Sequence, residues 1–144
     1  MTKKACPKCQ KTLPVSEFDF RDKARTKIQS YCKGCANTAW REWYSQPRNK
    51  QHHLATLAKR RARRIERNRA IIRHLKGAPC TDCGLTFPPE AMDFDHLENK
   101  DELISKLVFS VGTKRLLAEI SKCEVVCANC HRVRTQRRMS KSMQ

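Results

Sequence analysis

The sequence of 144 residues predicts a small α+β fold in which clusters of cysteines replace a large hydrophobic core. Hydrophobic residues make up 39% of the chain and aromatic residues only 6%, so burial of apolar side chains alone would stabilise a fold poorly. Eight of the nine cysteines fall into four C-x-x-C pairs. Segments with helical periodicity alternate with short apolar runs of strand length. These observations together predict a zinc-stabilised α+β protein.

The cysteine pairs are expected to bind metal rather than to form disulfides. No apolar segment near the N-terminus suggests a signal peptide and no stretch is long enough to span a membrane, so a reducing compartment and no membrane partner are expected. Reduced C-x-x-C pairs are typical of tetrahedral zinc sites. Cys123, the unpaired cysteine, is expected to be a small buried residue beside the second site. Two structural Zn²⁺ ions are predicted, one on Cys6, Cys9, Cys32 and Cys35 and one on Cys80, Cys83, Cys127 and Cys130.

Residues 1–36 are predicted to form an N-terminal zinc module. The 22 residues between Cys9 and Cys32 fit a zinc knuckle, a short hairpin and a second knuckle that leads into a helix. The candidates for its core are Val15, Phe18 and Phe20. The module is also basic, so it either folds around zinc without contacting a partner or adds to a binding surface.

Residues 37–77 are predicted to form a basic helical arm that is broken near Pro47. Trp40, Trp43 and Tyr44 have the i, i+3, i+4 spacing of one helix face. Packing of this face against the zinc module is expected, with stacking on nucleic-acid bases as the alternative. Residues 48–76 contain eleven Lys or Arg and a single acid, with a narrow apolar stripe at helical spacing.

The charge of the chain indicates a polyanionic partner. There are 31 Lys and Arg against 14 Asp and Glu, a formal net charge of +17. An anionic membrane is disfavoured because no strongly apolar helix face is available to insert. Like charges one turn apart repel within a helix, and an anionic ligand would relieve that repulsion. Double-stranded DNA is therefore the expected partner of the arginine cluster, with a solubilising linker helix as the alternative: Arg60, Arg61, Arg63, Arg64 and Arg67.

Residues 78–144 are predicted to form a third segment with a strand, a helical excursion and a final helix. Ala91 to Asp95 is the expected strand, and Val125 with Val126 indicates its partner. A short helix is expected over residues 113–121, with Thr113 as the candidate N-cap. After Cys130 the chain is predicted to be helical to about residue 139.

The Asp95-His96 pair and the Cys127-x-x-Cys130-His131 sequence resemble the HNH, or ββα-metal, endonucleases of phages and bacteria that carry C-x-x-C pairs. The resemblance covers about residues 80–138. It implies a ββα-metal catalytic domain over residues 78–144, in which Asp95 and His131 hold one catalytic Mg²⁺ or Mn²⁺ and His96 is the general base. The family usually has an Asn that orients the base, and here that position is Lys122.

The same residues fit the chemistry of phosphodiester hydrolysis. An imidazole can deprotonate water near neutral pH, and a divalent ion can stabilise charge on the phosphate. Neighbouring residues of a strand point to opposite faces, so Asp95 and His96 are expected to have different roles. Asp93, on the same face as Asp95, is a candidate for an additional ligand or for a carboxylate that supports the ligands. Four arginines that follow the site are expected to contact the DNA backbone: Arg132, Arg134, Arg137 and Arg138.

The predicted activity is therefore metal-dependent DNA cleavage in the cytoplasm of a bacterial or phage-infected cell. Homing, nicking and resolvase-like roles all fit, and a homodimer is left open. The alternative is a non-catalytic zinc-dependent nucleic-acid-binding or regulatory protein. In that interpretation the C-terminal segment is a zinc ribbon, Asp95 and His96 have no catalytic role, and His131 can even serve as a zinc ligand.

Overall fold

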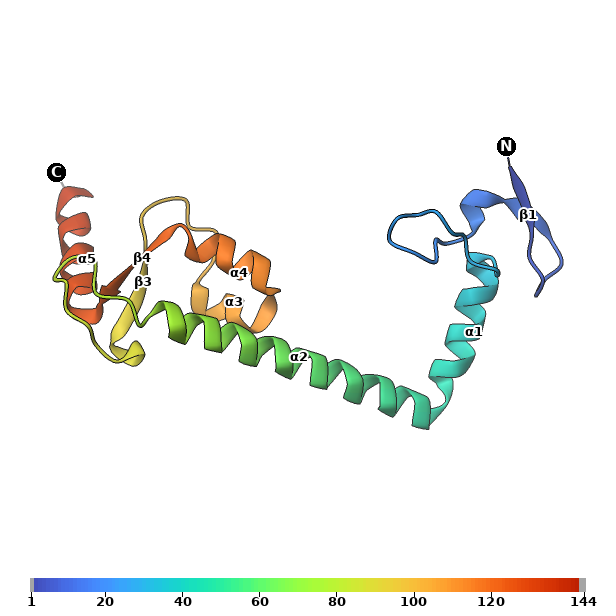
Figure 1. Cartoon of the computed structure of the whole chain (residues 1–144), viewed down its shortest axis with the longest axis horizontal. Coiled ribbons are helices and arrows are strands. Elements are labelled where there is room, and N and C mark those ends of the chain that lie inside the picture. The colour runs from blue at the N-terminus through green and yellow to red at the C-terminus, as the bar shows by residue number, and fades with distance from the viewer. Residues whose placement is uncertain (1, 143–144) are drawn as a thin grey trace. The chain divides into compact units, whose positions relative to one another are not determined.

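The computed structural model describes residues 2–142, and the side chains of residues 2–140. Within these residues it contains five α-helices and two small antiparallel sheets, which confirms the small α+β fold (Figure 1). The chain divides into two compact units, Met1–Leu57 and Ala58–Gln144. The division falls within the segment 37–77 that was expected to be a helical arm.

The first unit is built around a cysteine-rich core. Strands β1 (Lys3–Ala5) and β2 (Thr12–Pro14) pair antiparallel with Lys4 opposite Leu13. A 3-10 turn, η1 (Val15–Glu17), precedes Phe18, which packs with Cys6 and Cys32 in the buried core. Of the three predicted core residues only Phe18 is buried. The side chain of Phe20 is 46% exposed, Val15 is half-buried, and the core is completed by Leu13 and Ile28.

The expected break near Pro47 separates two helices. Helix α1 (Lys33–Ser45) ends at Ser45 with Gln46 as its C-cap, and α2 (Pro47–Leu75) begins at the proline. Proline suits a first helical position because that residue has no intrahelical partner for an N–H group. In α1, the Trp40 ring stacks on the rings of Trp43 and Tyr44, and His53 of α2 meets all three rings edge-on. The expected packing of these rings on the zinc module is therefore wrong.

The second unit is organised around the pair β3 (Met92–His96) and β4 (Cys123–Cys127). They are antiparallel, with Met92 opposite Cys127 and His96 opposite Cys123, which confirms the predicted strand and its partner. A 3-10 turn, η2 (Pro89–Ala91), leads into β3. In the sequence, helices α3 (Ile104–Ser110) and α4 (Thr113–Ile120) form the connection from β3 to β4, and α5 (Ala128–Ser142) follows β4. The sequence did not predict α3.

Two apolar clusters hold this unit together. One combines Met92 and Val126 with Cys80 and Cys127. The other combines residues of α3 and α4 with Ile72 and Leu75 of α2. Cys123 belongs to the second cluster and donates a weak hydrogen bond to the carbonyl of Glu119, so its expected place beside the zinc site is wrong.

Asn68 fixes the second half of α2 to the α3–α4 pair. It is the buried residue of α2, and its Nδ2 donates to the carbonyls of Val108 and Val111, each at 3.1 Å. Its Oδ1 accepts a hydrogen bond from the Thr113 hydroxyl at 3.0 Å. Thr113 is thus a partner of Asn68 rather than the predicted N-cap, a position that Gly112 occupies.

Candidate functional site

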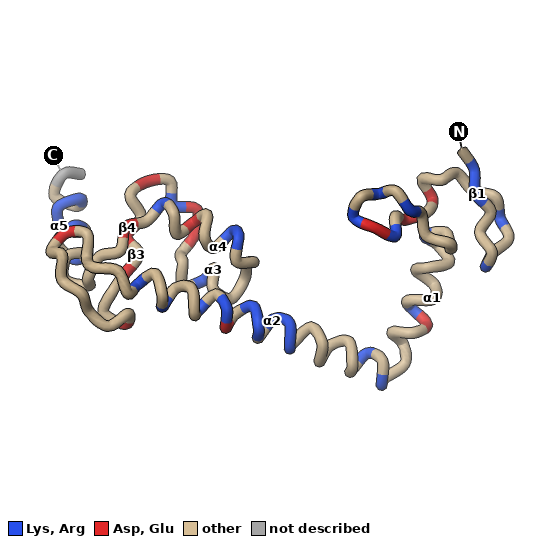
Figure 2. The backbone as a smooth tube through the Cα atoms, viewed as in Figure 1, with Lys and Arg blue, Asp and Glu red and all other residues tan. Residues whose placement is uncertain are grey.

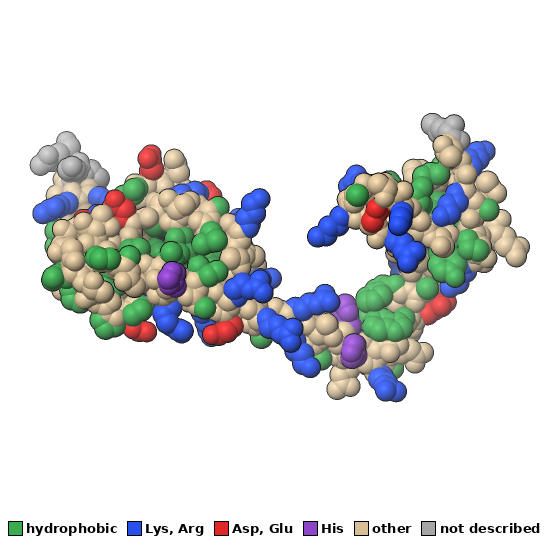
Figure 3. All heavy atoms as spheres, viewed as in Figure 1, with side chains coloured by type: hydrophobic (Ala, Val, Ile, Leu, Met, Phe, Trp, Pro, Cys, Tyr) green, Lys and Arg blue, Asp and Glu red, His purple; other side chains and the backbone are tan. Residues whose placement is uncertain are grey.

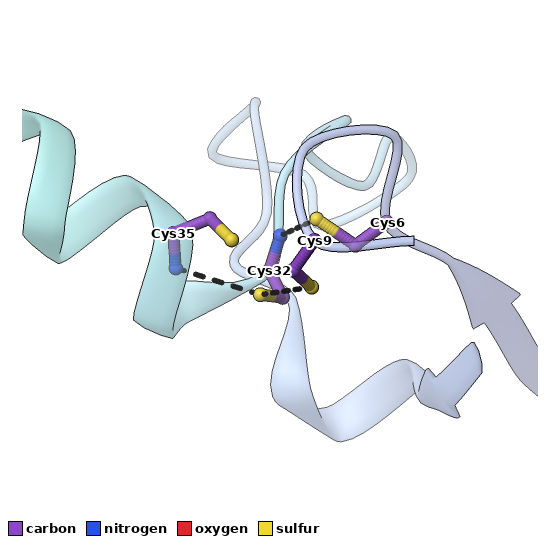
Figure 4. Close-up of side chains that lie close together, drawn as sticks. All are labelled: Cys6, Cys9, Cys32 and Cys35. Atoms are coloured by element: carbon purple, nitrogen blue, oxygen red, sulfur yellow. Dashed lines mark hydrogen bonds between the residues drawn. The ribbon is translucent and has the colours of Figure 1, made fainter. Parts of the chain in front are cut away.

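The first candidate metal centre is formed by a turn and a helix start. Cys6 and Cys9 lie in the turn after β1, and Cys32 and Cys35 lie at the cap and in the first turn of α1 (Figure 4). The four Sγ atoms lie within 4.8 Å of one another. The backbone N–H of Cys32 donates to Cys6 Sγ at 3.4 Å and lowers the pKa of Cys6 to about 6. The hydrogen bond with Cys32 raises the pKa of Cys35 to about 12.

The second candidate centre repeats this arrangement. Cys80 and Cys83 lie in a turn that closes at Gly84, whose φ of 71° favours glycine. Cys127 ends β4 and Cys130 lies in the first turn of α5. The four Sγ atoms again lie within 4.8 Å of one another. Backbone N–H groups, first that of Cys83, lower the pKa of Cys80 to about 6, and the hydrogen bond with Cys127 raises that of Cys130 to about 12.

Both clusters fit Zn²⁺. Four thiolates at the usual Zn–S length of about 2.3 Å would have sulfurs about 3.8 Å apart, and Cys9 Sγ lies 3.9 Å from Cys32 Sγ. None of the nine cysteines, all of which the structure describes, forms a disulfide. The residues can therefore hold two structural zinc ions. His131 is not among the ligands of either cluster, although it follows Cys130 directly.

The second cluster places His131 against β3. Because Cys130 is in the first turn of α5, His131 faces the carboxylates of Asp93 and Asp95. His131 Nδ1 lies 3.1 Å from Asp93 Oδ2, and Nε2 lies 3.5 Å from Asp95 Oδ1. The three predicted metal ligands are thus brought together, and Asp93 and Asp95 share a strand face as expected.

Asp95 is also the acceptor of two arginines of α5. Its carboxylate is only 3% exposed. Arg138 donates to both of its oxygens, at 2.8 and 2.6 Å, and Arg134 donates at 3.0 Å. These contacts, first those of Arg138, hold the pKa of Asp95 below its usual range. Arg134 pairs in addition with Asp82 and Glu124.

The four arginines expected to contact DNA after the site are therefore not equivalent. Arg134 and Arg138 are committed to carboxylates of their own unit. Arg132 and Arg137 are exposed on α5. A phosphate group could therefore contact Arg132 or Arg137 without breaking an ion pair within the protein.

His96 makes a contact that the sequence did not predict. Its Nε2 lies 3.1 Å from Oε1 of Glu119, a buried carboxylate of α4. The same Oε1 accepts the backbone N–H of Asp101 at 2.9 Å, and Lys122 Nζ donates to Oε2 at 2.8 Å. The ion pair with Lys122 is the main reason why the pKa of Glu119 is lowered to about 2.

One sequence signal could have identified Glu119. It is a carboxylate on the apolar face of a short helix, next to Ile120 and one turn after Leu116. A buried acid requires partners, because desolvation penalises an unpaired charge. Lys122 forms its ion pair with Glu119 and does not contact His96.

A pocket of about 680 Å³ gathers the candidate groups of the second unit. Asp93, Asp95, His96 and His131 all line it. The basic residues Lys76, Lys100 and Arg138 line it as well and favour an anionic ligand. The pocket therefore combines a candidate base, candidate metal ligands and positive charge.

The basic face of α2 is exposed over most of its predicted length. Lys and Arg recur along this helix (Figure 2). Arg64 is the exception, because its Nη2 donates to the carbonyl of Phe109 at 3.1 Å and its side chain is half-buried. The others have exposed side chains and no carboxylate partner among the described residues: Arg60, Arg61, Arg63 and Arg67.

Comparison with known proteins gave no match to a family model, a curated protein or a solved structure. In the described part of the chain, no helix is both long and apolar enough to cross a membrane. The chemistry of the two cysteine clusters is compatible with a zinc-dependent protein that acts on or with nucleic acid.

Proposed function

We propose that this protein is a metal-dependent DNA endonuclease of the HNH type. The observation that carries the proposal is the convergence of Asp95, His131 and His96 on one pocket next to a zinc-binding cluster. The order of β3, β4 and α5 also supports it, because a ββα-metal site takes its ligands from a strand and from the following helix. The likeness to that family rests on these residues alone.

The donor set fits a hard divalent cation. Asp95 and His131 would hold Mg²⁺ or Mn²⁺, with Asp93 as a further oxygen ligand. The bound ion would stabilise negative charge on the phosphate. Asp95 is able to serve because its carboxyl, with a lowered pKa, is ionised at neutral pH. The chain itself supplies the remaining groups.

His96 would take the proton from the attacking water. An ionised Glu119 accepts a hydrogen bond from Nε2–H, and this fixes the neutral tautomer whose Nδ1 carries the free lone pair. Glu119 is held in turn by Lys122 and by the backbone of Asp101. In this proposal Glu119 is a positioning residue that takes over the orienting role of the missing Asn.

Double-stranded DNA is the proposed partner. The net charge of +17 favours a polyanion, since each neutralised phosphate releases counterions. The exposed arginines of α2 and of α5 would contact the backbone. The two zinc ions would be structural and would contribute directly to folding.

One observation favours the alternative, a zinc-dependent nucleic-acid-binding protein without catalysis. Asp95 is fully paired by Arg134 and Arg138, as a carboxylate with a purely structural role would be. The two hypotheses share the zinc sites and the basic surface. They differ in whether His96 is needed for a chemical step.

Cleavage of supercoiled plasmid with Mg²⁺ or Mn²⁺ separates the two hypotheses. The wild-type chain would be compared with His96→Ala and with His74→Ala, a matched control at an exposed histidine of α2. We expect the control to cut like the wild type and His96→Ala to be about 10²- to 10⁴-fold slower with unchanged DNA affinity. Equal binding by all three proteins without any cutting would support the alternative.

A further inference from the structure

The first unit carries an aromatic cluster at the junction of α1 and α2, formed by Trp40, Trp43, Tyr44 and His53. The ring centroids of Trp40 and Trp43 are 5.0 Å apart with an interplanar angle of 27°, and those of Trp40 and Tyr44 are 5.6 Å apart at 26°. The His53 ring meets all three rings edge-on. The edge-on contacts hold the stacked rings in a defined orientation.

This aromatic cluster is not part of the core of its unit. The buried core consists of Cys6, Phe18 and Cys32 with their neighbours, and it includes none of the four rings. Trp40 remains 48% exposed and Trp43 39% exposed. Hydrophobic side chains are visible at the surface of α1 (Figure 3). Large exposed aromatic rings that add nothing to a core indicate a binding surface.

The surroundings of the aromatic cluster are basic. Arg41, Arg48 and Lys50 lie within the same stretch of chain, against one acid, Glu42. Lys50 Nζ lies over the Tyr44 ring, 5.9 Å from its centroid. The first unit as a whole has twelve Lys or Arg and four Asp or Glu. A second copy of the chain would bring the same cations face to face, which opposes self-association through this surface.

We propose that the aromatic cluster binds unpaired nucleotide bases by stacking, so that the preferred partner is DNA with a single-stranded segment. Flat rings with flanking cations match the two parts of a single strand, the exposed base faces and the phosphates. In a continuous duplex the base faces are covered by their neighbours. The inference rests on the proposed function only in taking DNA as the partner, and it requires no cleavage.

Tryptophan fluorescence reports on this surface directly, because Trp40 and Trp43 are the two tryptophans of the chain. The zinc-loaded full chain would be titrated, without Mg²⁺ or Mn²⁺, with a short oligothymidylate. An abasic oligonucleotide of the same length is the matched ligand, because it keeps the phosphates and removes the bases. We expect quenching by the first and little change with the second. A duplex of equal length should quench less than the single strand.

Variants test the same point by the anisotropy of a labelled strand. Trp40→Ala should weaken binding of the oligothymidylate about 5- to 150-fold, while Trp40→Phe should keep most of the affinity. Leu54→Ala, at an equally exposed residue of the same unit, is the control and should bind normally. The zinc content of each variant shows whether the unit has folded.

Each outcome decides the proposal independently of the plasmid assay. Equal quenching by the abasic strand would reduce the interaction to phosphate contact and overturn it. Quenching that depends on protein concentration alone would identify a second copy as the occupant and overturn it as well. Base-dependent quenching together with an inactive His96 site would support the inference while the nuclease proposal fails.

Discussion

Replacement of Asn68 by Ala should loosen the attachment of the basic helix α2 to its own unit. The side chain makes three hydrogen bonds, and two of them satisfy the carbonyls of Val108 and Val111 at the end of α3. The last carbonyls of a helix have no intrahelical donors, so Asn68 acts as a remote C-terminal cap. Ala would leave both carbonyls without this donor, that of Val108 in a buried position and that of Val111 in a partly buried one.

The expected cost follows from these contacts. A buried carbonyl left unpaired costs about 1–3 kcal/mol, and Val111 lies where water can partly replace the amide. We expect a loss of about 2–4 kcal/mol in the free energy of unfolding of the second unit. Thr113→Val removes only the hydrogen bond to Asn68 Oδ1 and should cost about 1 kcal/mol.

Urea denaturation of the zinc-loaded chain, followed by circular dichroism, measures both costs. Asn68→Asp is a stringent comparison, because it keeps the size and the acceptor for Thr113 but cannot donate to the two carbonyls. It should therefore be at least as destabilising as Asn68→Ala. A cost below about 0.5 kcal/mol for Asn68→Ala would show that the buried contacts do not anchor α2, and the reasoning would fail.

Three further predictions concern zinc, base positioning and DNA affinity. Native mass spectrometry should find two zinc ions in the wild type and in Cys123→Ser but one in Cys83→Ser, because Cys83 belongs to a cluster of four thiolates and Cys123 belongs to neither cluster. Glu119→Gln should slow plasmid cleavage at least about tenfold while DNA binding is retained, and an unchanged rate would remove Glu119 from the mechanism. Gln at four exposed arginines should reduce the slope of log K against log salt by about 0.9 per lost phosphate contact, measured by anisotropy between low and moderate salt: Arg60, Arg61, Arg63 and Arg67.

The features that were predictable from the sequence depend on neighbouring residues. A C-x-x-C pair implies a tight turn around a metal. The four pairs come together in two clusters of four cysteines, as expected. Pro47 ends one helix and starts the next because of its own geometry. The strand from Met92 and its partner are indicated by short apolar runs, and the two segments pair as expected. Such signals need no knowledge of distant contacts.

The features that were missed depend on residues far apart in the chain. Asn68 looks like one more polar residue of a basic helix, and its burial becomes visible only with Val108 and Val111 some 40 positions later. Glu119 reaches His96 across 23 positions, and no pattern between them indicates the contact. The exposure of the rings around Trp40 was likewise misjudged, because the helical spacing places them on one face but does not show what that face contacts.

Arg138 links the proposed metal binding at Asp95 with the proposed binding of DNA. A carboxylate as buried as Asp95 needs positive charge nearby, and Arg134 and Arg138 supply it. Arg134 is also tied to Asp82 and Glu124, whereas Arg138 has Asp95 as its carboxylate partner and is half exposed. A divalent ion at Asp95 would provide the charge that Arg138 now provides and would free its guanidinium for a phosphate oxygen. Under the endonuclease proposal, Arg138 would therefore neutralise Asp95 while no metal is bound and would be available to DNA once a metal holds Asp95, whereas in a non-catalytic protein the Arg138–Asp95 ion pair would persist.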